Sequence, residues 1–460
     1  MTEAPLLRLL PFRQASSWNI KQLFSGPGCG GIHPARPLSD ALTRRREAVC
    51  LEDAAEYTRI TIRTNCGGVV VRDRLPGAKI KTKHQYRIHA GQLAVSKIDA
   101  RNGAFGAVPP EAEGAVITGN FWVYDLCPQI ARLDYLVRLL ACPRFVQVWE
   151  ACSHGSGNRL YLQEAQFLRS PVPFPPLSEQ QALAQAFAAA EGRAGELDAQ
   201  ADALEAQAER SLLEALGVAE RPEAPSSTQH TLLQTARFRS LTQWGYDKVE
   251  GRFPFRFTTY PPVSLEQAPQ LCLELFRGKS PRYDPQGTQV VLNQRCNRKN
   301  EIQLQYAKPV SAAWLKRIAP ERFTMPGDLL INSTGEGTLG RASLVGREQS
   351  GLFLDSHLLL LRLRTDLVNP CFFAHLFNSR LIQCQVEQLK GAQATKQTEL
   401  GVENVRRIRF PLPPLEIQQT LGAQADRQAI QARQLRAQAV QLRAQAQQAF
   451  ETAVFGCETP

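Results

Sequence analysis

The sequence of 460 residues lacks an apolar run long enough to cross a membrane. No stretch approaches the roughly eighteen apolar residues that a membrane span requires. The apolar run within the starting segment MTEAPLLRLLPF is too short for a secretory signal. The eleven cysteines are an odd number, and none falls in a CxxC pair or at zinc-ligand spacing. We therefore expect a cytoplasmic protein with reduced thiols, no membrane contact and no metal.

The sequence also lacks a complete catalytic motif. GEGTLG at 335–340 satisfies the dinucleotide pattern G-x-G-x-x-G, but RASLVG follows and reads as a strand where the cofactor needs a helix. RGKS at 277–280 resembles the end of a P-loop, yet Leu273 stands where its first glycine should be, and Pro281 stops the required helix. NPCF at 369–372 resembles an amino-methyltransferase motif, but a helix cap explains it more simply. No nuclease motif or His pair at metalloprotease spacing is found, so we expect no cofactor and no catalysis by this chain.

Charge is unevenly distributed along the chain. Residues 1–175 contain 22 Lys and Arg against 14 Asp and Glu, and residues 221–411 contain 26 against 16. Residues 176–220 contain 2 against 9. Clustered cations neutralise phosphates, so two basic blocks around an acidic segment suggest two units that bind a polyanion. A generally basic protein complement in the cell is the alternative explanation.

An internal repeat divides the chain. PVPFPPLSEQQALAQAF at 171–187 recurs as RFPLPPLEIQQTLGAQA at 409–425, an offset of 238 residues. After each copy, small or apolar residues recur at alternating steps of four and three for about four to five heptads, which is typical of a coiled coil. The expected seam includes Leu183, Phe187, Leu197, Leu204, Leu421, Leu435 and Leu442.

The two predicted helices differ in charge. The first has seven acidic residues and two arginines between 182 and 216, and the second has four arginines and two acidic residues between 419 and 455. Opposite charges favour antiparallel pairing of the two helices, although each exposed ion pair contributes little. Two unrelated surface helices are the alternative, which the shared register disfavours. A helix of about 35 residues is roughly 50 Å long, so the pair is expected to hold the two globular blocks at a fixed distance.

Each globular block reads as mixed α and β. The first predicts a helix over Leu133–Leu140, and in the second Asn369 and Pro370 start a helix through Phe377. The predicted strands are VVVRD (69–73), AKIKT (78–82), QLAVSKI (92–98), VITGNFWVYDL (116–126), TQVVLN (288–293), DLLINST (328–334), RASLVG (341–346) and HLLLLRL (357–363). The blocks are faintly alike, because Gly91-Gln-Leu-Ala-Val-Ser matches Gly327-Asp-Leu-Leu-Ile-Asn.

Four sequence elements carry a resemblance to a known family. They are SKIDARNGAFG (96–106) with VITGNFW (116–122), GKSPRYDPQGTQVVLNQRCNRKNEI (278–302), PGDLLINSTGEGTLGRASLV (326–345), and the two PPL-x3-Q heptad segments. In this order, around two heptad helices, they resemble the specificity subunit of type I restriction-modification enzymes. The resemblance implies two target-recognition domains that each read one half of a split DNA site. It also implies two spacer helices that bind methyltransferase subunits.

The expected architecture is α+β, with two mixed α/β target-recognition domains separated by two long helices that pair as an antiparallel coiled coil. The expected segments are an N-terminal extension (1–45), the first target-recognition domain (46–175), the first spacer helix (176–220), the second target-recognition domain (221–411) and the second spacer helix (412–460). The implied partners are double-stranded DNA, two methyltransferase subunits and, through the complex, restriction and translocase subunits.

Candidate DNA contacts concentrate in two stretches outside the helices. Arg, Lys, Asn and Gln read base edges, and cations, hydroxyls and backbone amides contact phosphates. The first stretch contains Arg74, Lys79, Lys81, Lys83, His84 and Gln85, joined by Lys97, Arg101 and Asn102. The second contains Asn293, Gln294, Arg295, Asn297, Arg298 and Lys299, joined by Lys279, Arg282, Ser333, Thr334 and Arg341. For any one of them, a solvated surface side chain is the alternative.

Two other functions stay open at this point. A fused DNA methyltransferase with unrecognised motifs would transfer methyl groups on its own. A coiled-coil scaffold would join other proteins without reading DNA sequence. The target bases do not follow from the sequence, because they depend on loop geometry and DNA shape as well as on side chains.

Overall fold

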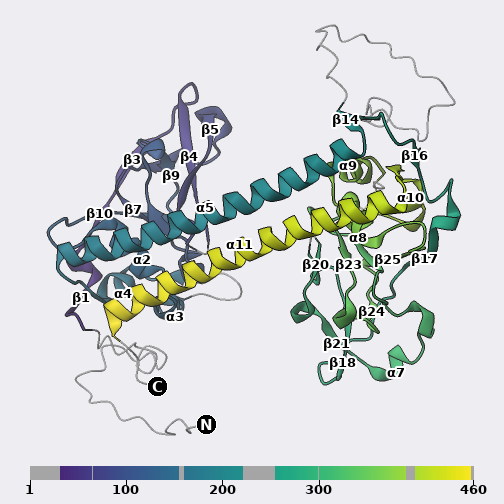
Figure 1. Ribbon diagram of the computed structural model, residues 1–460. Coiled ribbons are helices and arrows are strands. Elements are labelled where there is room, and N and C mark those ends of the chain that lie inside the picture. Colours follow the sequence, from purple (N-terminus) through teal and green to yellow (C-terminus); the bar gives the residue numbers. More distant parts are fainter. Residues whose placement is uncertain are drawn as a thin grey trace. The chain divides into compact units, whose positions relative to one another are not determined.

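A computed structural model describes residues 32–64, 66–154, 160–220, 254–298, 300–389 and 399–456 (Figure 1). The chain divides into two compact units. Unit 1 comprises residues 1–196 and 438–460, and unit 2 comprises residues 197–437. Each unit is an α+β domain together with part of each of two long helices. Among the described residues, no helix combines the length and apolar character needed to cross a membrane.

In the described part of unit 1, two larger sheets are accompanied by two short strand pairs. The four-stranded sheet has the order β2-β10-β7-β8 and is antiparallel throughout. The five-stranded sheet has the order β3-β6-β9-β4-β5, in which β4 and β9 are parallel. The strands, including the short pairs β1-β13 and β11-β12, are β1 (Ala35–Pro37), β2 (Leu42–Arg45), β3 (Glu47–Cys50), β4 (Glu56–Ile62), β5 (Val69–Pro76), β6 (His84–Arg87), β7 (Leu93–Ser96), β8 (Phe105–Ala107), β9 (Val116–Ile117), β10 (Phe121–Leu126), β11 (Ser153–His154), β12 (Tyr161–Leu162) and β13 (Pro171–Pro173).

Aromatic side chains fill the core between the four-stranded sheet and the helices of unit 1. The helices are α2 (Leu133–Leu140), α3 (Pro143–Ala151) and α4 (Glu164–Arg169). Trp149 stacks on Phe145 at 5.4 Å between ring centroids and meets Phe167 at 5.3 Å. These large rings are almost fully buried, so they contribute much of the apolar surface removed from water.

Unit 2 is built from a four-stranded sheet, β17-β25-β22-β23, and a three-stranded sheet, β21-β18-β24. Its strands are β14 (Val218–Glu220), β15 (Phe255–Phe257), β16 (Pro262–Val263), β17 (Cys272–Arg277), β18 (Gln289–Leu292), β19 (Asn297–Arg298), β20 (Glu301–Ile302), β21 (Lys308–Val310), β22 (Leu329–Asn332), β23 (Ala342–Leu344), β24 (Phe353–Leu354), β25 (Leu358–Leu363) and β26 (Phe410–Pro411). Its short helices are α7 (Ala312–Leu315), α8 (Pro370–Phe377), α9 (Arg380–Leu389) and α10 (Val402–Arg407).

The leucine run of β25 explains how the layers of unit 2 are joined. Successive side chains of a strand point to opposite faces of its sheet. Leu359, Leu361 and Leu363 enter the core that contains α8 and α9. Leu358 and Leu360 enter a second core, which contains β18 and β24. Residues 358–361 form an unbroken apolar run because this part of the strand is buried on both faces.

The four-stranded sheets of the two units have the same topology. β2, β10, β7 and β8 correspond in order and direction to β17, β25, β22 and β23. Two helices follow in each copy, α2 and α3 in unit 1 and α8 and α9 in unit 2. The faint likeness between the two blocks is thus a duplicated fold.

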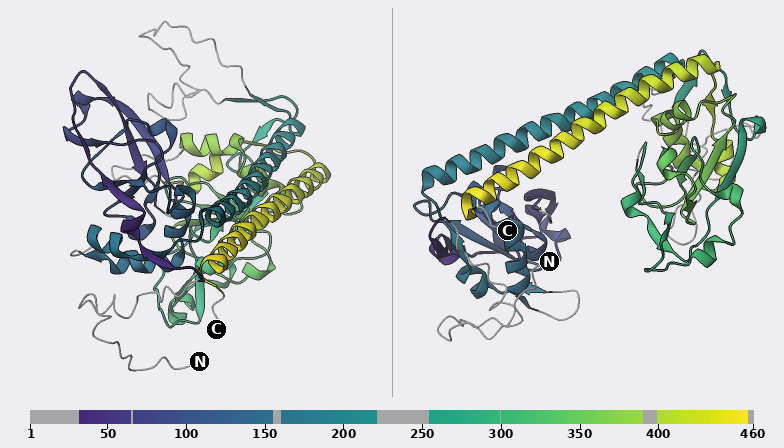
Figure 2. Two further views of the ribbon diagram at one scale, coloured as in Figure 1. Left: turned by 90° about the vertical axis from the view of Figure 1, so that its left-hand side faces the viewer. Right: turned by 60° about the horizontal axis from the view of Figure 1, so that its bottom comes forward.

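The long helices are α5 (Leu177–Ala215) and α11 (Leu415–Phe455), and they pack together in opposite directions (Figures 1 and 2). In unit 1, Phe187 of α5 meets Phe450 of α11 at 6.2 Å between ring centroids. In unit 2, Arg436 of α11 is paired with Asp202 and Glu205 of α5. The expected antiparallel pair is confirmed.

The seam of the helix pair has the expected register except at two ends. Leu183, Leu197, Leu204, Leu421, Leu435 and Leu442 are half-buried, and Phe187 is buried. Near the end of α5, the heptad reaches Ala215, but this residue is exposed, and Leu212, Leu213 and Leu216 are buried in the core of unit 2 instead. Near the end of α11, the heptad reaches Ala449, but this residue is exposed, and Phe450 is buried in unit 1 instead. The heptad is therefore replaced by domain packing where each helix meets a globular core.

A buried glutamine anchors the start of each long helix. The Gln180 Nε2 group donates to the carbonyls of Ile130 (2.9 Å) and Pro175 (2.8 Å), and its Oε1 accepts from the Arg132 N–H at 2.8 Å. Arg132 is the N-cap of α2. The neighbouring Gln181, which occupies the glutamine position of PPL-x3-Q, is exposed.

Gln418 makes the same three bonds in unit 2. Its Nε2 donates to the carbonyls of Leu367 (3.1 Å) and Pro413 (2.8 Å), and its Oε1 accepts from the Asn369 N–H at 2.8 Å. Asn369 caps α8, and its side chain accepts from the Phe372 N–H. The interpretation of NPCF as a helix cap is confirmed.

Three further features of the fold differ from the expectation. The predicted strand at 116–126 is two strands, β9 in the five-stranded sheet and β10 in the four-stranded sheet, separated by the turn that contains Gly119. Residues 35–45 belong to unit 1, not to an extension, because β1 pairs with β13 and β2 is an edge strand of the four-stranded sheet. The predicted strand at 78–82 is wrong. A 3-10 turn at Gly77–Lys79 occupies that position and buries Gly77 against the backbone of Glu52.

Replacement of glycine by alanine is expected to have opposite effects on stability at two positions of the long helices. A methyl group at Gly192 would meet nothing within 4 Å, whereas one at Gly422 would lie 2.8 Å from the backbone nitrogen of Phe372. Gly192→Ala should stabilise by about 1 kcal/mol, because alanine is the better helix former. Gly422→Ala should destabilise by about 1–3 kcal/mol, because α8 must move away. Thermal unfolding midpoints that shift in the same direction would contradict this account of Gly422.

Candidate nucleic-acid interface

Unit 1 has an open cleft of about 560 Å³ between its two sheets. Its lining includes Arg59 on β4, Arg72 on β5 and Asn120 in the turn between β9 and β10. The β4-β5 ladder shifts register between Arg59 and Ile60, so Arg72 is the extra residue of a β-bulge. Bulges redirect side chains, and this one contributes a cation to the cleft wall.

Asp73 holds Arg59 in place at the cleft. The Nε and Nη2 atoms of Arg59 each donate to one carboxylate oxygen of Asp73 at 2.7 Å. This pairing lowers the pKa of Asp73, so its carboxylate stays ionised. Arg72 also approaches Asp73, at 3.3 Å. Two guanidinium groups share one carboxylate, which leaves excess positive charge at the wall.

The predicted residues of unit 1 separate into three groups. Lys79, Lys81 and Gln85 line the cleft. Arg74, His84 and Asn102 are exposed outside it. Lys83 is paired with Asp53 and donates to the Gly77 carbonyl, which occupies its ammonium group.

The loop between β7 and β8 carries the other candidates of this unit. Lys97 lies over the Trp122 ring at 5.5 Å, and burial lowers its pKa. Arg101 and Asn102 lie in the 3-10 turn Ala100–Asn102, which a left-handed Gly103 ends. This loop occupies the same place in its sheet as the GEGTLG turn does between β22 and β23.

In unit 2 the candidates lie around the loops at one end of the four-stranded sheet. Lys279 and Arg282 are exposed after β17. The neighbouring Ser280 hydroxyl donates to Ser356 at 3.3 Å, which links this loop to the turn before β25.

The polar contacts continue from that turn to the candidates beyond β18 and β22. Thr334 bonds to the His357 Nδ1 atom at 2.8 Å and donates to the Gln294 Oε1 atom at 3.2 Å. We call Lys279, Ser280, Gln294, Thr334, Ser356 and His357 the polar loop surface. The GEGTLG sequence is the turn of the β22-β23 hairpin, and the strand expected after it is β23.

An aromatic ring joins two further cations of unit 2. The guanidinium groups of Arg295 and Arg298 lie 5.2 and 4.8 Å from the centroid of Tyr306. The Arg298–Glu301 hairpin and the 3-10 turn at Leu304–Tyr306 place them together. Such stacking holds planar guanidinium groups in the geometry that matches phosphates and guanine edges.

Several predicted contacts lie in the interior. Asn297 is fully buried, and its Nδ2 group donates to the Leu330 carbonyl, the Asn332 Oδ1 atom and the Arg341 carbonyl. Asn293 and Ser333 are also buried, Arg341 is half-buried, and Gln85 is only 4% exposed although it lines the cleft. These positions favour a structural role over contact with DNA. Lys299 lies outside the described residues.

Other residues at these surfaces escaped the sequence analysis. They are Arg59 and Asn120 at the cleft, and Tyr306, Ser356 and His357 in unit 2. These residues carry no local signal, because only the sheet topology brings them beside the predicted residues. Arg72 begins the basic stretch at 72–87 that holds most of the predicted contacts of unit 1.

Burial predicts different outcomes for two neighbouring side chains. Asn297→Ala removes a donor that serves three acceptors, so it should destabilise unit 2 by about 1–3 kcal/mol. Arg295→Ala, its exposed control, should change stability by about 0.5 kcal/mol or less. Thermal unfolding of the two variants checks this, and equal shifts would count against a structural role for Asn297.

No protein-family model and no curated protein sequence matches this chain. Similar folds occur among solved structures. A chain in a structure of the type I R-M system is 16% identical with a TM-score of 0.49, and the match covers 91% of this chain and 97% of that chain. The HsdS subunit from Thermoanaerobacter tengcongensis is 17% identical (TM-score 0.38; 92% and 96% covered), and the type I restriction-modification system S subunit from M. genitalium is 12% identical (TM-score 0.45; 92% and 96% covered). All three TM-scores are below 0.5, so this likeness is no argument for the function of the chain.

Proposed function

We propose that this chain is the DNA-reading specificity subunit of a type I restriction-modification complex. It binds a bipartite double-stranded DNA site, one half with each unit, and directs partner methyltransferase and restriction subunits to that site. The chain itself has no catalytic role. The observation that carries the proposal is the duplicated four-stranded sheet, together with the cationic and amide side chains that each unit exposes near it.

The charge and side-chain types of both surfaces support DNA as the ligand. The cleft of unit 1 offers cations for phosphates through Arg72, Lys79 and Lys81. In unit 2, Gln294 and His357 offer donors and acceptors of the kind that read base edges. Except for Arg72 on β5, these residues lie on loops and turns held by a packed sheet, which is the usual way that binding groups are positioned.

The resemblance in sequence supports the remaining parts of the proposal. The PPL-x3-Q segments begin two paired helices, α5 and α11, as spacer helices of the specificity subunits do. By that resemblance, the exposed faces of the pair bind methyltransferase subunits, and the restriction subunits join through them. Methyl transfer by the purified chain alone would contradict the non-catalytic part.

Phosphate binding predicts a salt dependence that follows the cleft lysines. Lys79→Ala with Lys81→Ala should weaken binding to all duplexes alike and reduce the slope of log K against log salt by up to about 1.8, or about 0.9 per contact. The control is Arg36→Ala with Arg169→Ala, which removes the same charge from exposed residues of unit 1 outside the cleft. An equal loss of DNA affinity in both double variants would show that only the net charge of the protein matters, and it would refute DNA binding in the cleft.

Duplication predicts that the two halves of the site are read independently. Selection from randomised duplexes with the full chain should enrich two short blocks separated by a constant gap. Gln294→Ala with His357→Ala should relax the preference in one block at about 1–3 kcal/mol per lost base contact. The other block should stay unchanged. A single continuous site, or relaxation in both blocks, would refute the proposal of two half-sites.

A further inference from the structure

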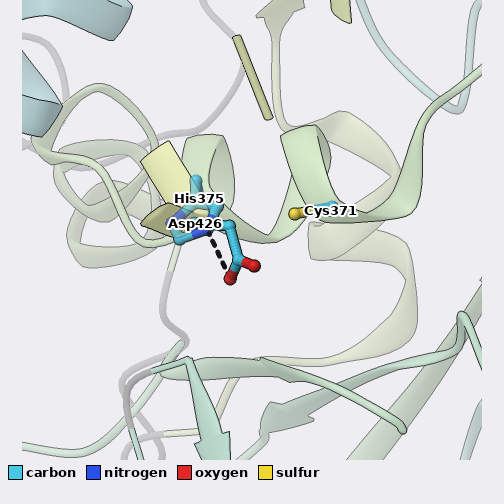
Figure 3. A group of neighbouring side chains, drawn as sticks. All are labelled: Cys371, His375 and Asp426. Atoms are coloured by element: carbon cyan, nitrogen blue, oxygen red, sulfur yellow. Dashed lines mark ion pairs between the residues drawn. The ribbon is translucent and has the colours of Figure 1, made fainter. Parts of the chain in front are cut away.

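Three side chains of metal-ligating type meet where α8 packs on α11 (Figure 3). Cys371 and His375 are one turn apart on α8, and Asp426 comes from α11. Their candidate ligand atoms all lie within 4.8 Å of one another, and the His375 Nε2 atom is 3.7 Å from the Asp426 Oδ1 atom. In Figure 3 the Cys371 sulfur is turned toward the other two side chains. Among the described residues, this is the one group of three such side chains.

The close approach of the two helices produces this cluster. Gly422 has no side chain to keep the first turn of α8 away, and the Cys371 thiol donates to the Gly422 carbonyl at 3.6 Å. His375 and Asp426 each lie four residues further along their own helices. Residues four apart share one face of a helix, so the second pair meets beside the first.

The chemistry of the three ligands suits zinc. A thiolate, an imidazole and a carboxylate bind Zn²⁺ at about 2.3, 2.0–2.1 and 2.0–2.2 Å in a tetrahedral arrangement. The edges of such a tetrahedron are about 3.3–3.7 Å, so the longest separation must shorten by about 1 Å. Asp426 is half-exposed and can rotate to supply this movement.

We propose that Cys371, His375 and Asp426 bind one Zn²⁺ ion, with a water molecule as the fourth ligand. The Cys371 thiol loses its proton to solvent when the metal–sulfur bond forms. The ion ties α8 of the globular domain to α11. A cavity of about 40 Å³, lined by His375, Glu209 and Ala425 among others, adjoins the cluster and has room for water. This site is separate from the proposed DNA surfaces, and the inference does not rest on them.

The duplicated position in unit 1 argues against a purely structural explanation. Counted from the N-caps Arg132 and Asn369, Asp134 and Arg138 stand where unit 2 has Cys371 and His375, and the repeat offset of 238 residues places Ala188 at the position of Asp426. The Arg138 guanidinium lies 3.5 Å from the centroid of the Phe187 ring, and none of these three positions carries a thiol or an imidazole. The fold therefore does not require a cysteine and a histidine at this interface. A His375–Asp426 ion pair alone does not involve the facing Cys371 thiol, which donates to the Gly422 carbonyl.

Cobalt provides a direct test, because a cobalt–thiolate bond absorbs light and zinc is silent. The full chain is stripped with a chelator and titrated with Co²⁺. We expect one equivalent to produce thiolate charge-transfer absorption with the visible bands of tetrahedral cobalt, and Zn²⁺ to displace it. Binding to the folded state alone should also raise the thermal unfolding midpoint.

Matched variants assign the site to these residues. Cys371→Ser should abolish the charge-transfer band, whereas Cys384→Ser, a half-buried cysteine of α9 outside the cluster, should leave it unchanged. Asp426→Asn keeps the size of a half-exposed side chain and should weaken Co²⁺ binding about tenfold or more. Circular dichroism checks that each variant is folded. If Cys371→Ser does not fold, the Co²⁺ affinity of Asp426→Asn decides the test. An absent thiolate band in the parent chain, or unchanged affinity in Asp426→Asn, would overturn the proposal.

Discussion

The structure depends on how each long helix is fastened to its globular domain, and a buried glutamine does this twice. Gln180 and Gln418 each use both amide hydrogens and the amide oxygen on backbone groups. The oxygen in each case accepts from the N-cap residue of the first helix after the four-stranded sheet. A buried amide with any of these bonds missing would cost about 1–3 kcal/mol. The helix therefore leaves its domain at one position and one rotation.

Because these hydrogen bonds fix where each long helix begins, the two long helices could be predicted from the sequence. In each copy, the prolines of PPL-x3-Q end the preceding segment, and the buried glutamine fixes the first turn of the long helix by hydrogen bonds. The heptad pattern then continues without interruption to the middle of the helix pair. The helices Leu133–Leu140 and Pro370–Phe377 were predicted with the observed bounds, because a helix boundary is a local property. The strand at 78–82 failed because its alternation of cations and apolar residues is equally compatible with an exposed turn.

The sequence predicted which polar stretches lie near the candidate site. It did not predict which of their side chains are exposed at the site and which are buried. Lys79 and Lys81 reach the cleft, whereas Asn293 and Asn297 from an equally polar stretch are buried. Asn293 donates to the Tyr306 carbonyl, and Asn297 donates to the Leu330 carbonyl. Sequence alone does not separate these roles, since an amide next to a strand end serves either one. The contact between Thr334 and His357 joins residues 23 positions apart, and it follows only from the pairing of β22 with β25.

The charges of the helix pair define which helices associate. Within unit 2, Arg436 is held by Asp202 and Glu205, and within unit 1, Arg443 meets Glu191 at 3.2 Å. Each pair is partly exposed and adds little stability by itself. Their effect is on specificity, because two copies of the acidic α5 would place carboxylates against carboxylates along the same seam. Small side chains line the seam, and alanines such as Ala194 and Ala432 provide little shape complementarity that would select one partner helix over another. Opposite charge therefore makes α11 of the same chain the preferred partner of α5.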